Sequence, residues 1–283
     1  MDKNLYIDAS HPNETRVVLK SENNIEDYEY EGIKNSLIKN NIYLGKVSRI
    51  EPSLQAAFVD FGREKHGFLS FNDIQSDYYQ IPKSDLEIIK QEEEKAREEL
   101  SKEIEAKDEE NLAEGKLEVD DPIEKKEIED KELPDEKEVK TPKKFRFKKY
   151  KIQEVIKPNQ VILIQVIKDE RGQKGAALST FISIAGKYIV LMPNTPKGGG
   201  ISRKIFNPAD RKKIRSILNE IEIPKEMGLI VRTAGSNKTK NEINHDLTTL
   251  INTWNQIKET AINSIAPSLI HQESEIIKRT LRD

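Results

Sequence analysis

The sequence predicts an α+β protein that is built around a small closed β-barrel and carries one long insertion. Three observations support this prediction. Short strand-like runs lie on both sides of a highly charged segment, and that segment contains too few apolar residues to fold by itself. After it, strand-like runs are followed by two amphipathic helices.

The chain begins with strand-like pieces and continues into the predicted barrel. Residues 1–36 hold three such pieces, at Leu5–Asp8, Thr15–Leu19 and Asp27–Tyr30. Residues 37–178 hold the predicted barrel strands, at Ile42–Ile50, Ala56–Phe61 and Val161–Lys168. Gly45 predicts a bulge, and Pro52 with Ser53 predicts a turn.

Residues 84–140 interrupt the barrel and predict a disordered or partly helical insertion. They carry 24 Asp and Glu against 11 Lys and Arg, and two prolines, Pro122 and Pro134. Opposite charges four residues apart favour a solvated helix over Leu86–Lys107. The run Lys143–Lys151 that follows mixes basic and aromatic residues. It could bind nucleic acid by stacking and charge, or it could be a basic β-strand that returns to the sheet.

The chain after Ala176 is predicted to form a mixed α/β unit. Phe181–Ile184 and Tyr188–Met192 predict strands, and Gly228–Gly235 predicts a buried strand that ends in a turn. Asn207 and Pro208 begin a helix, and a second long helix carries one apolar face, at Leu247, Leu250, Ile251, Trp254 and Ile257. A last helix begins at Ser274 and reaches Asp283 without a stop signal, which we interpret as a truncated chain.

Composition limits the classes of function. The insertion has a net charge of −13 and the remainder a net charge of +10, which favours a polyanionic partner, although a basic surface also serves solubility. The chain has no cysteine, so it has no disulfide or thiolate metal site. With no signal sequence and no run long enough to span a membrane, we expect a cytoplasmic protein.

Few residues predict catalysis. The four histidines, at positions 11, 66, 245 and 271, lie far apart in sequence and show no metal-ligand spacing. Asp60 and Asp246 are carboxylates of the kind that magnesium prefers, but their spacing does not indicate a site. No phosphate loop or nucleophile elbow is present.

Two groups of residues predict nucleic-acid binding instead. Phe58 and Phe68 are candidate stacking platforms, with Lys46, Arg49 and Lys174 as nearby cations; the alternative is that both rings belong to the core. The second group is a candidate phosphate pocket. It centres on Arg232 and Thr233 and is lined by Gly186, Val190 and Arg203, although most such strand ends are simply solvated.

The order of these motifs resembles the ribonuclease E/G family. Three runs resemble the opening of that family's RNA-binding barrel, at Asn41–Val47, Glu51–Gly62 and His66–Leu69, and Asp169–Phe181 resembles its closing segment. Four runs look like its 5′-sensor region, at Gly186–Asn194, Gly199–Arg203, Gly228–Gly235 and His271–Ser274. The resemblance covers nearly the whole chain except the insertion.

The resemblance implies a domain organisation. Residues 1–36 would be the first strands of a ribonuclease H-like subdomain, 37–178 an OB-fold barrel of the S-one type, 179–273 the 5′-sensor subdomain and 274–283 the start of a further helix.

The resemblance also implies a magnesium-dependent endoribonuclease that cuts single-stranded A/U-rich RNA with a 5′-monophosphate, in RNA processing and mRNA decay. Phe58, Phe68 and Lys174 match the positions that hold RNA. The terminal phosphate is held by positions that match Gly186, Val190, Arg203, Arg232 and Thr233. The family's catalytic aspartates and its shared zinc site lie in later subdomains, so no catalytic or metal-binding residue and no bound cofactor is expected in this chain. The parent is expected to be a tetramer, in the cytoplasm or at the inner membrane, with partners in RNA degradation.

Two other classes of function remain open from the sequence. One is a non-catalytic module that binds RNA and senses its 5′ end. The other is a protein-interaction module in which the acidic insertion is the working part.

Overall fold

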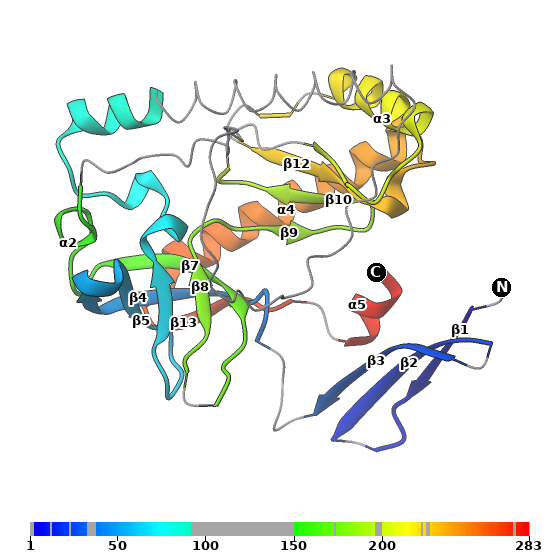
Figure 1. The fold of residues 1–283 in the computed structure, drawn as a ribbon, viewed down its shortest axis with the longest axis horizontal. Coiled ribbons are helices and arrows are strands. Elements are labelled where there is room, and N and C mark those ends of the chain that lie inside the picture. The colour runs from blue at the N-terminus through cyan, green and yellow to red at the C-terminus, as the bar shows by residue number, and fades with distance from the viewer. Residues whose placement is uncertain are drawn as a thin grey trace, which may run out of the picture.

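The computed structural model describes residues 3–11, 13–22, 24–32, 38–91, 150–172, 174–195, 200–221, 223–224, 227–273 and 276–282. It contains an N-terminal sheet, a β-barrel and a mixed α/β unit (Figure 1). Among the described residues, no helix is both long and apolar enough to cross a membrane.

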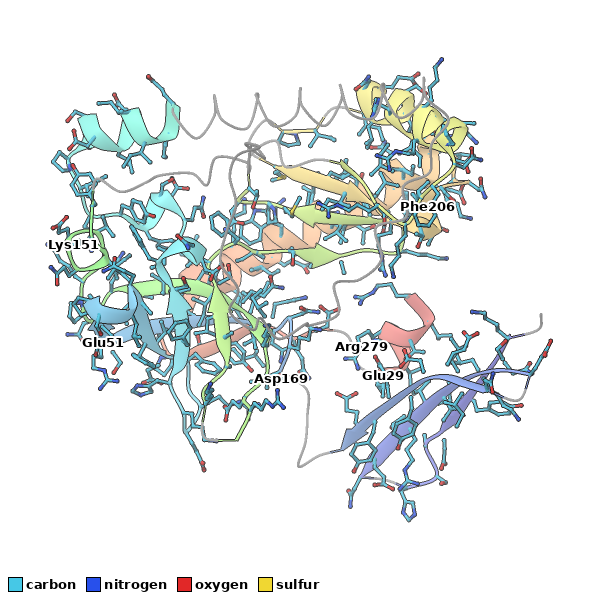
Figure 2. The ribbon with its side chains drawn as sticks, in the orientation of Figure 1. Glu29, Glu51, Lys151, Asp169, Phe206 and Arg279 are labelled. Carbon is cyan, nitrogen blue, oxygen red and sulfur yellow. The ribbon has the colours of Figure 1, made fainter. Side chains whose placement is uncertain are left out.

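The N-terminal sheet is a three-stranded antiparallel meander of β1 (Lys3–Asp8), β2 (Glu14–Ser21) and β3 (Asn24–Gly32). All three predicted pieces are confirmed as strands. The last helix, α5 (Ile276–Arg282), packs against β2 and β3, so it lies on the first sheet of the chain (Figure 1). Arg279 on α5 forms an ion pair of 2.8 Å with Glu29 on β3 (Figure 2).

The barrel has five strands. These are β4 (Ile42–Glu51), β5 (Ala56–Asp60), β6 (Gly67–Ser70), β7 (Val161–Lys168) and β8 (Ala177–Ser179). They pair in the order β4-β5-β6-β8-β7, and β7 pairs back onto β4, so the sheet closes. The pair β6–β8 is parallel and the others are antiparallel. The interior of the barrel is apolar and buried. Five of its side chains have no exposed surface: Val47, Val59, Leu69, Ile164 and Val166.

The connections of the barrel are short helices. The predicted turn at Pro52 is the 3₁₀ helix Pro52–Leu54, and two more 3₁₀ turns follow β6, at Phe71–Asp73 and Ser76–Tyr78. Helix α2 (Ile152–Val155) leads into β7.

The predicted bulge at Gly45 is wrong. Gly45 pairs regularly with Ile162, and the register between β4 and β5 shifts later, between Val47 and Arg49. A Cβ at Gly45 would lie 2.6 Å from Cγ1 of Val59, so glycine is required there by close packing and not by an irregular backbone.

Residues 83–91 form a helix, so the first residues of the predicted insertion are helical. The Tyr150 hydroxyl donates a hydrogen bond to Asp85, and Lys90 pairs with Asp77 at 2.6 Å, so this helix is tied to the barrel. The rest of the insertion and Lys143–Lys149 of the basic run lie outside the described residues. Tyr150 and Lys151 are not in a strand and lead directly into α2.

The mixed unit holds a four-stranded sheet with the order β11-β12-β10-β9. Its strands are β9 (Ile184–Ala185), β10 (Ile189–Met192), β11 (Gly200–Ile201) and β12 (Gly228–Val231). Both predicted helices are confirmed as α3 (Pro208–Glu220) and α4 (Lys240–Asn263), and the Asn207 side chain caps α3 by accepting from the N–H of Ala209 at 3.1 Å. The apolar face of α4 packs on β10 and forms a common core with it.

The predicted strand at Phe181–Ile184 is shorter than expected. Only its last residue, Ile184, is in β9, since the backbone N–H groups of residues 181–183 bond to side chains and not to a neighbouring strand. These acceptors are Ser179 Oγ, Asn194 Oδ1 and Gln165 Oε1, at 3.1, 2.9 and 2.8 Å.

Strands β6, β8 and β11 were not predicted, and neither was the strand that follows α4. β13 (Ser268–His271) follows α4 and pairs antiparallel with β4, so the chain returns from the mixed unit to the barrel.

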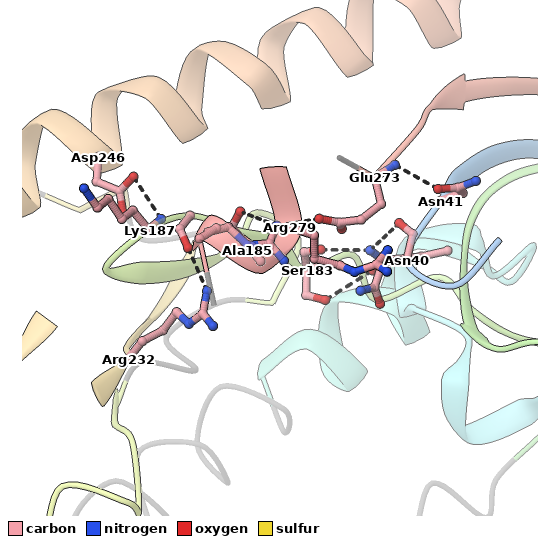
Figure 3. A network of polar contacts seen from close by, with 12 residues as sticks. Asn40, Asn41, Ser183, Ala185, Lys187, Arg232, Asp246, Glu273 and Arg279 are labelled. Carbon is pink, nitrogen blue, oxygen red and sulfur yellow. Dashed lines mark hydrogen bonds and ion pairs between the residues drawn. The ribbon is translucent and has the colours of Figure 1, made fainter. Parts of the chain in front are cut away.

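A set of buried polar contacts joins these units (Figure 3). Gln165 is 1% exposed, and its amide donates to the carbonyls of Asn40 and Ser183 at 3.0 and 2.8 Å. Asn41 Oδ1 accepts the N–H of Glu273 at 2.8 Å, and Glu273 pairs with Arg282 of α5 at 2.5 Å. Barrel, mixed unit and C-terminal helix therefore meet in one hydrogen-bonded junction.

Candidate nucleic-acid interface

Two of the predicted RNA-binding residues lie side by side on the barrel. Phe58 on β5 and Phe68 on β6 are direct cross-strand partners, with ring centroids 6.0 Å apart and planes at 74°. The Arg49 guanidinium lies 4.8 Å from the centre of the Phe58 ring. Phe58 is half-buried and Phe68 is 36% exposed. Both rings therefore retain accessible surface, unlike the core Phe61, which is 1% exposed.

A shallow surface hollow of about 470 Å³ adjoins this pair. It is lined by Ser48, Arg49, Phe58, Glu64, Lys65, His66 and Gly175. Of these, Lys65 was not among the predicted contacts. Its ammonium group donates to the carbonyl of Gly172 at 2.7 Å and lies 3.7 Å from Glu170, so it fastens the loop before β8 to the loop before β6.

Lys174 is exposed at the edge of the same region. The backbones of Lys174 and Arg171 exchange two hydrogen bonds, at 3.0 and 3.1 Å, which form a tight hairpin end. The next residue, Gly175, lines the hollow, and a Cβ there would lie 2.0 Å from the His66 carbonyl oxygen. The hairpin is therefore pressed against the loop before β6, which places Lys174 beside the hollow and not in it. Lys46 is exposed on β4 but is not part of the lining.

The five predicted phosphate-binding residues come from three segments that meet at one end of the mixed sheet. β11 and β12 run parallel, with Ile201 opposite Val231, so Arg203 and Arg232 both follow the carboxyl ends of their strands. β10 is antiparallel to β12, with Ile189 opposite Val231, so Gly186 lies just before the start of β10 at the same end. Val190 faces away from the core that Ile189 and Leu191 join.

Arg232 is held in place by this end of the sheet. Its guanidinium donates to the Gly186 carbonyl at 2.9 Å, and its backbone N–H donates to the Tyr188 carbonyl at 2.8 Å (Figure 3). Thr233 opens the 3₁₀ turn Thr233–Gly235 and is exposed, as is Arg203. Arg232 thus offers a fork of N–H donors and Thr233 a hydroxyl at the same turn. Donors of these two kinds suit a small oxyanion.

Asp246 organises the neighbouring loop. Its carboxylate, on α4, accepts the backbone N–H groups of Lys187, Tyr188 and Ile189 at 3.3, 2.8 and 3.2 Å. A Cβ at Gly186 would lie 2.7 Å from this carboxylate, so glycine is the residue that fits. The sequence singled out Asp246 only as a possible magnesium ligand, because nothing local shows that a helix residue faces a loop 58 positions earlier.

Two lysines flank Tyr188 beside the same loop. The ammonium groups of Lys187 and Lys238 lie 5.3 and 5.0 Å from the centre of its ring. The Glu242 carboxylate next to Lys238 raises the pKa of that lysine. Sequence reasoning missed both contacts, since Lys238 belongs to the turn before α4 and reaches Tyr188 only in the folded chain.

The described residues offer no ligand set for magnesium or zinc. They contain no group of three His, Asp or Glu side chains placed to hold a metal ion, and cysteine is absent from the sequence. His66 lines the barrel hollow, and burial lowers the pKa of His271 on β13. The described residues therefore do not fit either metal.

The fold is an OB-like barrel joined to an α+β unit, and each part carries a surface chemically suited to nucleic acid. The sequence model of the Ribonuclease E/G family matches residues 183–283. Ribonuclease E from Buchnera aphidicola (subspecies Acyrthosiphon pisum) is 36% identical over 281 residues, which cover 99% of this chain and 24% of that protein.

Other relatives give the same result. Ribonuclease E from Escherichia coli is 36% identical over 281 residues, 99% of this chain and 21% of that protein. Ribonuclease G from Haemophilus influenzae is 26% identical over 272 residues, 96% of this chain and 43% of that protein. This chain belongs to the ribonuclease E/G family. It spans about a quarter of the length of the curated ribonuclease E proteins named above.

Proposed function

We propose that this chain is the RNA-binding and 5′-monophosphate-sensing part of an endoribonuclease that cleaves single-stranded, A/U-rich RNA in RNA processing and mRNA decay. The observation that carries the proposal is the convergence of three segments at one sheet end. That convergence brings Arg203, Arg232 and Thr233 to the same edge as Gly186.

The chemistry of that edge favours a terminal monophosphate. A guanidinium fork forms two parallel hydrogen bonds with a phosphate, and a hydroxyl adds a third. A phosphate monoester has three charged terminal oxygens for these donors, whereas a 5′-hydroxyl end has a single uncharged oxygen. A triphosphate would be too large for a pocket of one fork and one hydroxyl.

The barrel surface supports binding of the rest of the strand. Phe58 and Phe68 offer aromatic faces on adjacent strands, and Arg49 and Lys65 supply positive charge beside them. Because every base has a flat face, this arrangement accepts a single strand with little dependence on sequence. We therefore propose that the barrel provides affinity and that the edge around Arg232 distinguishes the 5′ end.

We assign the chemical step to the parent protein. Magnesium-dependent cleavage, the zinc site and the tetramer implied by the resemblance are proposals about that protein, because the described residues of this chain provide no metal ligand set. Partners in RNA degradation are likewise a proposal about the parent.

The Arg232→Ala variant tests the sensing function. We expect weaker binding of 5′-monophosphorylated RNA and nearly unchanged binding of the same RNA with a 5′-hydroxyl, both measured by fluorescence anisotropy. Thr233→Val, which removes one exposed hydroxyl, should give a smaller change in the same direction. Thr249→Val on α4 is the matched control, because its hydroxyl bonds to the His245 carbonyl within the helix. Equal losses for both RNA ends would refute the sensing role.

A further inference from the structure

The aromatic side chain of Phe206 is exposed to solvent. It is 69% exposed, more than any other aromatic side chain in the described part of the chain, and it lies between β11 and α3 (Figure 2). Single exposed apolar side chains are common and need no explanation on their own. Three features of its surroundings set Phe206 apart.

The backbone around Phe206 is fixed. The preceding Ile205 is 6% exposed and anchored in the core, and its N–H donates to the Ser202 carbonyl at 3.1 Å. The Arg211 guanidinium donates to the carbonyls of Ser202 and Ile205, both at 3.4 Å. The following Asn207 caps α3. Phe206 is thus presented to solvent from a rigid turn, so little entropy is lost when a partner contacts it.

Positive charge surrounds this turn in the sequence. Residues 203–215 contain six Lys and Arg and one Asp. Four of these cations are exposed: Arg203 and Lys204 in the turn, and Lys212 and Lys213 in the first two turns of α3. An aromatic face among exposed cations is the combination that binds single-stranded nucleic acid.

The turn also lies at the sheet end that carries the candidate phosphate pocket. β11 runs parallel to β12, and the Ser202 N–H donates to the Val231 carbonyl at 2.9 Å. Residues 202–206 therefore leave the sheet beside Arg232 and Thr233. An RNA whose 5′ phosphate occupied the pocket would have its first nucleotides within reach of this turn.

We propose that Phe206 is a stacking platform for an unpaired base near the 5′ end of single-stranded RNA, with the exposed Lys204, Lys212 and Lys213 contacting the adjoining phosphates. The proposal rests on the proposed 5′-sensing function and extends it. It favours single-stranded 5′ ends, because a base inside a duplex has both faces covered by its stacked neighbours.

Phe206→Leu and Phe206→Trp test the proposal as a pair. Leucine keeps the apolar bulk but removes the flat π face, whereas tryptophan keeps and enlarges it. With a 5′-monophosphorylated single strand of about ten nucleotides, we expect Phe206→Leu to lose about fivefold or more in affinity, and Phe206→Trp to bind at least as tightly as the unchanged protein. The same RNA paired to a longer complementary strand that extends past its 5′ end should not distinguish the variants, because both faces of its first bases are then covered.

Tryptophan fluorescence gives a second readout. Trp254 is the only native tryptophan and is 9% exposed, so it emits at shorter wavelength than a solvent-exposed indole, and the emission of the unchanged protein is subtracted as its background. Stacking of a base should quench the remaining emission of the Phe206→Trp variant as RNA is added. Thermal unfolding of the Leu variant checks that the fold is intact.

The outcomes separate this inference from the proposed function. If Phe206→Leu binds single strands like the unchanged protein, or loses affinity equally for paired and unpaired ends, the stacking role is overturned. If the unchanged protein does not discriminate 5′-monophosphate from 5′-hydroxyl, the sensing function fails instead, whatever the Phe206 variants do.

Discussion

At Gly175 the barrel surface leaves no room for a side chain. A Cβ there would meet the His66 carbonyl oxygen at 2.0 Å, and both partners are backbone, so a rotamer change cannot relieve the contact. We expect Gly175→Ala to destabilise the protein by roughly 1–3 kcal/mol, measured by chemical denaturation. Gly200→Ala is the control, because nothing lies within 4 Å of a Cβ at that position. Equal stability of the two variants would contradict the close approach.

Phe58 is the ring most directly placed for a base. It is flanked by Phe68 and by the Arg49 guanidinium, and it lines the hollow. We expect Phe58→Ala to weaken binding of 5′-monophosphate and 5′-hydroxyl RNA alike, by roughly 1–3 kcal/mol. Anisotropy titrations against both RNAs check this. An unchanged affinity would mean that the ring does not contact RNA.

At the scale of the element, α4 begins with a capping box that responds to pH. Glu242 Oε2 accepts the Thr239 N–H at 3.0 Å and the Thr239 hydroxyl at 2.9 Å. The Thr239 backbone N–H, followed by its hydroxyl and Lys238, lowers the pKa of Glu242. A carboxyl with a lowered pKa in the folded state stabilises the fold above its unfolded pKa, and this contribution is lost as pH falls through the folded pKa.

We therefore expect the first turn of α4 to fray as the pH falls into the acid range. Hydrogen exchange at Glu242 and Ile243, whose N–H groups bond to the Thr239 hydroxyl and carbonyl, measures this opening once the rates are divided by the intrinsic exchange rate at each pH. Glu242→Gln keeps an acceptor oxygen but no titratable group, so its protection should no longer follow the titration of that carboxyl. The same acid-induced opening in Glu242→Gln would show that another group is responsible.

The elements also differ in how well local sequence predicts them. α3 and α4 were predicted because their caps and apolar stripes are local signals. β6, β8, β11, β13 and the true extent of β9 were not. β13 is short and depends on pairing with β4, more than 200 residues earlier in the chain. At residues 181–183, side chains that are distant in sequence take the hydrogen bonds that a strand would use.

At the scale of the whole molecule, charge is divided unevenly along the chain. Residues 92–140 carry 22 Asp and Glu against 10 Lys and Arg, whereas the remaining residues are net positive. Like charges repel RNA over roughly a Debye length, about 10 Å at 0.1 M salt. Exchanging residues 92–140 for an uncharged Gly/Ser linker of equal length should therefore raise RNA affinity at low salt.

The gain should shrink as salt is added, because screening removes the repulsion. Anisotropy titrations at several salt concentrations measure both effects. An affinity that is unchanged at low salt would mean that the acidic residues stay out of range of the bound RNA. A loss of affinity would instead favour the view that the insertion itself contributes a working contact.

At this scale, polar contacts also fix the barrel relative to the candidate phosphate pocket at Arg232. Gln165 on β7 bonds to Ser183 just before β9, and Arg282 on α5 donates to the Ala185 carbonyl at 3.4 Å while pairing with Glu273. These contacts hold residues 183–186 in place. The last of these residues, Gly186, carries the carbonyl to which Arg232 donates (Figure 3). The position of Gly186 thus depends on all three parts of the molecule.

Hydrophobic periodicity, caps and turn residues in the sequence by itself determined the fold class, most strands and both long helices, because these signals act over a few residues. The order of its motifs also determined the family. Only the tertiary structure decided that Asp246 would bind the loop at residues 187–189, that Lys65 would line the barrel hollow and that Phe206 would lie exposed beside the candidate phosphate pocket. Each of these depends on strand register and on contacts between distant segments, which no local pattern encodes.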